Sequence, residues 1–144
     1  MPGSQTPSIY TRPVKITDSV AAISARGHTI FIKLDSTLWG FGINGQGQLG
    51  ENVKDQYQQQ PIKLMDGVIA AAAGEGYSVI IKKDHSLWAS GQNSNGSLGT
   101  NNTETLFRFI KVLDGVRNVS VSYQTTLIVK DDGSLWGTGR DDFG

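Results

Sequence analysis

The sequence contains no cysteine and no excess of charge of either sign. The absence of cysteine excludes disulfide bonds, zinc sites with cysteine ligands and catalysis by a thiol. The 13 basic and 13 acidic residues cancel, so the chain lacks the positive charge that favours binding to a nucleic-acid backbone. A nucleic-acid partner is therefore not expected.

Long apolar runs are also absent. No segment approaches the ~20 apolar residues that a transmembrane helix needs, and the first residues, MPGSQTPSIYTRPVK, lack the apolar core of a signal peptide. No membrane association is expected, and the default expectation is a soluble chain in the cytoplasm. Charged residues make up only 18% of the chain while glycine occurs 18 times, which is typical of many turns and few exposed amphipathic helices.

What the sequence does have is an internal repeat. The segment STLWGFGINGQGQLG at residues 36–50 returns as HSLWASGQNSNGSLG at residues 85–99, and it begins again as GSLWGTGRDDFG at residues 133–144. Three tryptophans recur with these segments at spacings of 49 and 48 residues: Trp39, Trp88 and Trp136. A period of this length indicates stacked structural units.

Each period contains short segments rich in β-branched and aromatic residues, separated by turn residues. These segments are residues 20–25, 29–33, 37–42 and 60–64, then 68–73, 78–82, 86–91 and 108–112, then 116–121, 126–130 and 134–139. Four strands in a period of about 50 residues are the signature of a β-propeller blade. The sequence predicts an all-β fold of about three blades, each of four antiparallel strands, as a partial propeller or a ring completed by another copy or by further sequence.

The repeat also sets the expected organisation of the chain. Residues 1–11 are an N-terminal tail, and residues 12–144 hold three repeats at approximately 12–59, 60–107 and 108–144, the last incomplete. Residues 12–16 (RPVKI) align with the outer strands QPIKL and RFIKV, so they predict a lone outer strand. Such a strand could complete the last blade where the ends of a ring meet.

The repeat accounts for a glycine pattern that would otherwise indicate a nucleotide-binding loop. Gly40, Gly42 and Gly45 fit the pattern G-x-G-x-x-G. In the second copy Ala89 replaces the first glycine, and no apolar stripe of helical period follows either copy. The glycines therefore predict a tight turn after a strand, and no cofactor is expected.

Two histidines and an acidic cluster are the remaining candidates for chemistry. His28 and His85 lack a matching nucleophile or a metal-binding spacing, and His28 is expected to bond backbone between strands. The acidic pairs at 131–132 and 141–142 are expected in turns, with Ca²⁺ binding as the alternative. The sequence thus predicts no catalytic residue, no metal site and no enzymatic activity.

The segments TLWGFGINGQGQLG, SLWASGQNSNGSLG and DGVIAAAAGEGYSVIIKKD resemble the repeats of the regulator of chromosome condensation family, which also occur in alpha-tubulin-suppressor-like proteins. The resemblance extends from Pro13 over nearly the whole chain and implies a propeller, which in this family usually has seven blades. The family's best-known activity is guanine-nucleotide exchange on a small GTPase, and it depends on an inserted wedge. Because this chain has no insertion longer than the loop at 44–59, that activity is not carried over.

A non-enzymatic scaffold for protein–protein interaction is the predicted function. The loops at 50–60 and 99–109 differ most between copies, and recognition usually lies in loops held by a rigid scaffold. The candidate partner-binding residues in these loops are Tyr57, Gln58, Asn101, Asn102 and Phe107. The partner is an unidentified protein, and self-association could complete a propeller.

Two alternative functions remain at this stage. A carbohydrate-binding accessory module would use the three tryptophan rings for stacking, although their register with the strands predicts that they pack between neighbouring blades. Guanine-nucleotide exchange is the other alternative, and it is less favoured for the reason given above.

Overall fold

The computed structural model describes residues 9–141, which form eleven strands and no helix. The first sheet contains β1 (Val20–Arg26), β2 (His28–Lys33), β3 (Leu38–Ile43) and β4 (Tyr57–Met65). The second contains β5 (Val68–Ala73), β6 (Tyr77–Lys82), β7 (Leu87–Gly91) and β8 (Leu106–Leu113), and the third contains β9 (Val116–Ser122), β10 (Thr125–Lys130) and β11 (Leu135–Gly139).

Neighbouring strands within each sheet are antiparallel and follow one another in the chain. The predicted all-β fold of four-stranded antiparallel blades is confirmed, with three strands in the third sheet. We call the sheets blade 1, blade 2 and blade 3 in chain order. Because the described residues include no helix, none of their elements is a helix that could cross a membrane.

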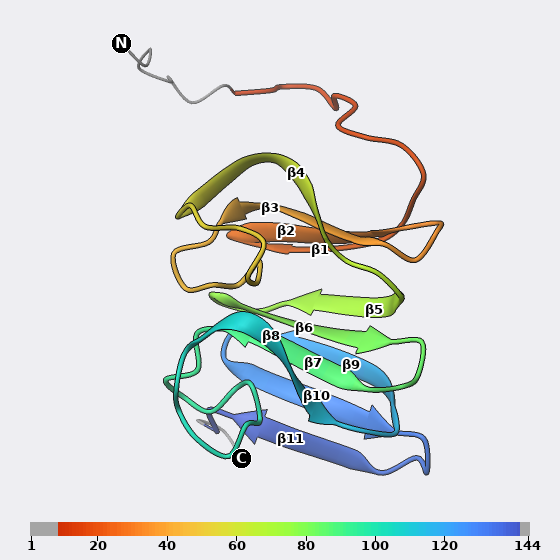
Figure 1. The fold of residues 1–144 in the computed structure, drawn as a ribbon, viewed down its shortest axis with the longest axis vertical. Coiled ribbons are helices and arrows are strands. Elements are labelled where there is room, and N and C mark those ends of the chain that lie inside the picture. The colour runs from red at the N-terminus through yellow and green to blue at the C-terminus, as the bar shows by residue number, and fades with distance from the viewer. Residues whose placement is uncertain (1–8, 142–144) are drawn as a thin grey trace.

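The three blades stack face to face, as Figure 1 shows from blade 1 at the top to blade 3 at the bottom. The first strands of the blades, β1, β5 and β9, contact one another along the stack. Four consecutive alanines end β5, and their small side chains allow the neighbouring sheets to approach closely at this inner edge.

Two hydrophobic clusters lie between the blades and form the core. The cluster between blades 1 and 2 includes Ile30, Ile32, Leu38, Leu49 and Ile80, and the cluster between blades 2 and 3 includes Tyr77, Val79, Leu87, Leu98 and Ile128. Each blade thus buries apolar side chains against the blade or blades beside it. Burial of apolar area between neighbours is the main source of stability in repeat arrays.

The loop after the third strand of blades 1 and 2 delivers a leucine to each cluster. Asn44 Oδ1 accepts a hydrogen bond from Leu49 N at 2.9 Å, while Asn44 Nδ2 donates to Val53 O at 3.0 Å. Asn93 Oδ1 accepts from Leu98 N at 3.0 Å in the same way. The asparagine of the repeat therefore folds the loop so that the leucine of its Leu-Gly ending is buried.

Two glycines of the G-x-G-x-x-G pattern, Gly40 and Gly42, serve this packing. A Cβ at Gly40 would lie 2.8 Å from the Leu49 side chain, and Gly42 has a φ of +104°, with a would-be Cβ 3.0 Å from His28 Cα. A side chain at either position would collide with the core or with the adjacent strand. The expected tight turn is found only at Gly45, whereas Gly40 and Gly42 lie within β3 itself, where they are needed for close packing.

The tryptophans lie on the third strand of each blade, each with the same set of hydrogen-bonded partners. Trp88 Nε1 donates to Ser86 Oγ at 2.8 Å, Ser86 Oγ donates to Asp84 Oδ1, and Lys82 Nζ lies 4.2 Å from the centroid of the Trp88 ring. The hydrogen bonds from Ser86 hold the pKa of Asp84 below its usual value. Blades 1 and 3 repeat the arrangement with Asp35, Thr37, Trp39 and Lys33, and with Asp132, Ser134, Trp136 and Lys130.

The prediction that all three tryptophans pack between blades is only partly right. Trp88 packs against the cluster between blades 1 and 2, but Trp39 is half-buried and Trp136 is 54% exposed. The residues paired with Trp39 and Trp88 on the fourth strands are Lys63 and Lys111. Blade 3 has no fourth strand among the described residues, so Trp136 lacks the cover that Trp88 receives.

The prediction of a strand at residues 12–16 is wrong. This segment has no strand structure, and it runs along the outward face of blade 1, as Figure 1 shows. Val14 and Ile16 line a cavity there together with Phe31 and Phe41, and Phe31 is only 2% exposed. The free strand edge that the segment was expected to complete belongs to β11, at the other end of the stack.

We expect Leu49→Ala to lower the free energy of unfolding by about 2–5 kcal/mol, because it leaves a cavity at a fully buried site between blades 1 and 2. In a chain of this size the melting temperature should fall by roughly 2–4 °C per kcal/mol. Leu34→Ala, at a position that is 73% exposed, is the control. Equal melting temperatures for the two variants would contradict the role of Leu49.

Candidate functional site

Three of the five candidate residues lie in strands, although the sequence predicted them in loops. Tyr57 begins β4 and pairs with Ile43, and Gln58 follows it. Phe107 is in β8, one residue after Leu106, which pairs with Gly91. The fourth strands start earlier than predicted because irregular pairing beside Gly42 and Gly91 lets them continue along the third strands.

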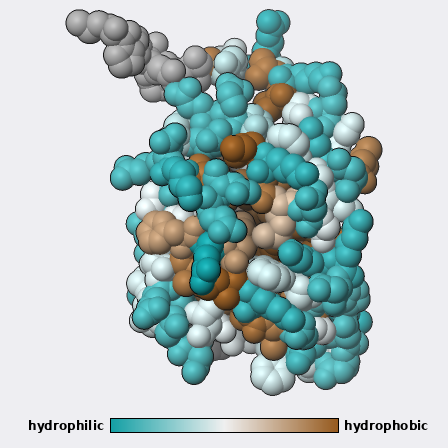
Figure 2. Space-filling view, in the orientation of Figure 1, coloured by the Kyte–Doolittle hydropathy of each residue, from teal (hydrophilic) through white to brown (hydrophobic). Residues whose placement is uncertain are grey.

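The two aromatic candidates are exposed, and they lie on different blades. Tyr57 is 59% exposed on blade 1, and Phe107 is 62% exposed on blade 2. The backbone of Phe107 is nevertheless fixed, since a Cβ at Gly47 of the preceding blade would lie 2.6 Å from Phe107 Cα. In Figure 2 this face of the molecule is mostly hydrophilic, with hydrophobic side chains gathered at mid-height, at the level of blade 2.

The two asparagine candidates share the loop between β7 and β8. Asn102 shapes this loop, because its Oδ1 accepts hydrogen bonds from Glu104 N at 3.0 Å and Thr100 Oγ1 at 3.1 Å, and its carbonyl accepts from Asn93 Nδ2 at 3.0 Å. Asn101 is exposed and has a φ of +60°. Asn102 therefore has a structural role, and of the two asparagines Asn101 is the one whose side chain is available to a partner.

Hydroxyl groups link each blade to the loop of the preceding blade, a feature that the sequence analysis missed. Ser78 Oγ donates to Gln48 O at 2.7 Å, and Thr126 Oγ1 donates to Ser97 O at 2.8 Å. These two hydroxyls occupy equivalent positions in β6 and β10, and both are buried. A second pair of hydroxyls makes the equivalent bonds one strand away, Ser90 to Gly47 O at 2.6 Å and Thr138 to Gly96 O at 2.7 Å.

His28 bonds a side chain of the next blade, which corrects the expectation of a backbone partner. Its Nε2 lies 2.7 Å from Ser78 Oγ, and the residue is only 2% exposed. Burial lowers the pKa of His28 from 6.5 to about 4, with the negative charge of Glu75 opposing the shift. The imidazole is therefore neutral at pH 7.

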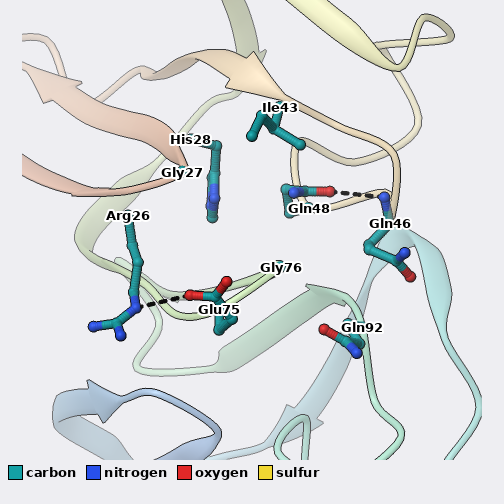
Figure 3. A pocket seen from close by; sticks show the side chains of 9 residues that line it. All are labelled: Arg26, Gly27, His28, Ile43, Gln46, Gln48, Glu75, Gly76 and Gln92. Atoms are coloured by element: carbon teal, nitrogen blue, oxygen red, sulfur yellow. Dashed lines mark hydrogen bonds and ion pairs between the residues drawn. The ribbon is translucent and has the colours of Figure 1, made fainter.

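A polar cavity opens beside His28, between blades 1 and 2. It has a volume of about 170 Å³, and its walls include His28, Gln46, Glu75 and Gln92 (Figure 3). Arg26 Nε donates to Glu75 Oε2 at 3.0 Å at the edge of the cavity. The Arg26 guanidinium also lies 5.1 Å from the centroid of the Tyr123 ring, so these three residues link three blades at the ends of the inner strands.

The acidic cluster at the end of the chain forms no metal site within residues 9–141. Asp131 Oδ1 lies 2.8 Å from His85 Nδ1, and Asp132 Oδ1 accepts a hydrogen bond from Ser134 Oγ at 2.6 Å. Both carboxylates thus have partners in or between hairpin turns, as expected for turn residues. Residue 142 of the second acidic pair lies outside the described residues.

Residues 116–144 match the model of the regulator of chromosome condensation (RCC1) repeat. This chain contains the RCC1 repeat. The match covers the last of the three repeated units and confirms the resemblance seen in the motifs of the sequence. A search of the curated proteins found no match.

Solved structures with a similar fold include two RCC1-related propellers. Human WBSCR16 superposes with a TM-score of 0.76 at 22% identity, covering 86% of this chain and 34% of that one. Prp20p from Saccharomyces cerevisiae gives a TM-score of 0.75 at 23% identity, covering 85% and 31%. Yeast RCC1 (Prp20) bound to Kap60 gives 0.74 at 22% identity, covering 90% and 32%.

These similarities establish the fold alone, because the identities are low. The chain spans about a third of the length of each of these solved structures. The three stacked blades therefore have the same fold as about a third of each of these structures.

The low pKa of His28 should make the stability of these RCC1-type blades depend on pH. An unfolded chain takes up the histidine proton below pH 6.5, whereas the folded chain does so only near pH 4. The stabilisation is therefore complete above pH 6.5 and is lost as the pH falls towards 4. Between pH 7 and pH 5 this loss amounts to about 2 kcal/mol.

Denaturant unfolding at pH 7 and pH 5 measures this effect. His28→Gln should lose about 2 kcal/mol less than the parent chain over that interval, because it has no proton to take up at this site. His85→Gln, which keeps His28, is the matched control. The same pH dependence in the parent and in His28→Gln would show that another group is responsible.

Proposed function

We propose that this chain is a non-enzymatic β-propeller scaffold that binds a protein partner through its outer strands and the loops before them. The observation that carries the proposal is that the repeated residues build the blades, whereas the exposed aromatic residues differ between the copies. Repeated positions, such as those of Asn44, Ser78 and Trp88, are engaged in packing or hydrogen bonds that build the blades. The exposed aromatic rings of Tyr57 and Phe107 stand at positions that vary between copies.

The structural neighbours support a protein partner without identifying one. Prp20p is described with its binding properties to Gsp1p and histones, and yeast RCC1 (Prp20) is described bound to Kap60. The shared fold makes a protein the favoured class of partner for this chain. Nucleotide exchange is not proposed, because the loops between strands hold no wedge-like insertion within residues 9–141.

The carbohydrate alternative is not favoured by the state of the tryptophans. Each indole N–H already donates to a hydroxyl, at 2.8 Å in all three blades. A lysine covers one face of each ring, with the ammonium 4.2 to 5.3 Å from the centroid. A sugar would have to displace these lysines to stack on that face.

Affinity capture with the immobilised chain tests the interaction surface. Replacing both Tyr57 and Phe107 with alanine should abolish retention of proteins captured by the parent chain, because aromatic anchors supply much of the energy of an interface. The melting temperature should change little, since both rings are largely exposed. Leu34→Ala, an exposed apolar residue at the opposite end of the strands of blade 1, should capture normally. Equal capture by the double variant would remove these strands from the interface.

We further propose that the open ends of the stack are covered by self-association. Leu135 is 69% exposed on blade 3, whereas the equivalent residues Leu38 and Leu87 are buried at 0% and 1%. Leu127 is also exposed, at 44%, on the same side of blade 3. Apolar positions that are buried in blades 1 and 2 are thus exposed on blade 3, and a second copy could complete the ring.

Sedimentation velocity over a dilution series tests the self-association. The parent chain should sediment as a discrete dimer at micromolar concentration, and Leu135→Asp should shift it towards the monomer by placing a charge on the buried face. Leu34→Asp adds the same charge at an exposed turn and should leave the dimer intact. A compact parent monomer that melts cooperatively would overturn the proposal.

A further inference from the structure

The two interblade junctions are built to the same plan but differ at two equivalent positions. At the junction of blades 2 and 3, the Tyr77 hydroxyl lies 3.1 Å from both Thr125 O and Thr126 Oγ1. Beside it, Asn95 Nδ2 donates to Gln124 Oε1 at 2.8 Å. Large side chains from both blades thus meet at the polar end of this junction.

At the junction of blades 1 and 2, smaller residues stand at both positions. His28 occupies the position of Tyr77, and Gly76 occupies the position of Gln124. The cavity of about 170 Å³ lies where the larger side chains would be (Figure 3). This volume is below the ~300–1,000 Å³ of pockets for drug-sized ligands, so an occupant must be small.

The wall of the cavity contains a buried hydrogen-bond acceptor without a partner. Ser78 has one hydroxyl hydrogen, which it donates to Gln48 O, so His28 must donate its Nε2–H to Ser78 Oγ. In this tautomer Nδ1 carries a lone pair. Among the buried side-chain atoms of the described residues, His28 Nδ1 is the one without a hydrogen-bond partner.

Two further acceptors face the same space. Arg26 binds Glu75 Oε2, and Figure 3 shows the other carboxylate oxygen turned towards the open cavity while the Arg26 guanidinium points away from it. Gln92 Nε2 donates to Ser94 Oγ at 3.3 Å, which turns Gln92 Oε1 towards Gly76, where a Cβ would lie 2.9 Å from that oxygen. The cavity thus combines acceptors on three residues, and the negative charge of Glu75 is paired with the positive charge of Arg26 at its edge.

We propose that this cavity binds a primary ammonium group on a short aliphatic stem. An ammonium offers three N–H donors and no acceptor, which matches an imidazole nitrogen, a carboxylate and an amide oxygen. The half-exposed side chain of Ile43, at the cavity wall, gives the methylene stem an apolar surface. The group could come from a lysine side chain or from a free alkylamine. Only the lysine source rests on the proposed scaffold function.

Titration of the full chain with n-butylammonium chloride tests the site, followed by the imidazole nitrogen resonances of His28. Saturable binding with a shift of the Nδ1 resonance is expected, and n-butanol, which has the same stem without the charge, should bind at least tenfold more weakly. Failure to saturate by about 100 mM, where a millimolar site would be full, overturns the proposal and leaves water as the occupant.

Two variants and a control locate the binding. Glu75→Gln removes the charge at the cavity and should weaken n-butylammonium binding at least tenfold, while Glu104→Gln makes the same change in an exposed loop and should have no effect. His28→Tyr should abolish binding by filling the space as Tyr77 does. If His28→Tyr does not fold, Glu75→Gln still decides, since Glu75 is largely at the surface. Equal affinities in both glutamate variants would contradict the site.

A second ligand separates the two sources of the ammonium group. Nα-Acetyl-lysine methylamide should bind more tightly than n-butylammonium if the site receives a lysine of a partner, and with the same affinity if the site receives a free amine. Either result supports an ammonium site. Failure of the ammonium site is distinguishable from failure of the scaffold proposal, because the scaffold proposal is tested by affinity capture with the Tyr57 and Phe107 double variant.

Discussion

The arrangement of the blades depends on one buried hydrogen bond that recurs at each junction. A hydroxyl on the second strand of a blade donates to a backbone carbonyl in the loop of the blade before it, through Ser78 at the first junction and Thr126 at the second. A buried carbonyl without a donor would be costly, by about 1–3 kcal/mol. The bond therefore fixes the register of one sheet against the next, whereas the hydrophobic clusters supply attraction without direction.

Packing and hydrogen bonding within and between the blades also explain why most repeated side chains have no group free to bind a partner. The asparagine folds the loop, and the leucine is buried in the core. The tryptophan N–H donates to the hydroxyl of the serine or threonine two residues earlier, which in turn donates to an aspartate. The proposed recognition of a partner therefore uses positions that the repeat does not constrain. Tyr57 and Phe107 belong to this group, and so does the pair of replacements that opens the cavity beside His28.

Much of the fold could be predicted from the sequence because local patterns determine the strands. The β-branched runs and the recurring Leu-Trp pairs place the eleven strands to within a few residues, and the period gives the grouping into blades. Tyr57 and Phe107 were expected in loops because irregular pairing beside glycine is not visible in a local pattern. Residues 12–16 look like an outer strand, yet a strand also needs a partner edge, and the free edge of β11 belongs to the far blade.

The candidate site was harder to predict because its parts are about 50 residues apart in the sequence. His28 meets Ser78, and Arg26 meets Glu75, only when two blades are stacked. No local signal indicates that the histidine bonds a side chain rather than backbone. Comparison of equivalent positions could have shown that His28 and Gly76 are both smaller than Tyr77 and Gln124, and thus that one junction has room that the other lacks.

The stacking also makes blade 2 the most stable of the three blades against local unfolding. It is covered on both faces, by one hydrophobic cluster on each side, while blades 1 and 3 are each covered by a neighbouring blade on one face. In a one-dimensional array the unit with two neighbours opens last, and the ends fray first. Amide hydrogens of β6 and β7 should therefore exchange with solvent most slowly, and those of β11 much faster. The middle of the sequence is thus the most protected part of the chain, and protection decreases towards the outer blades on either side of it.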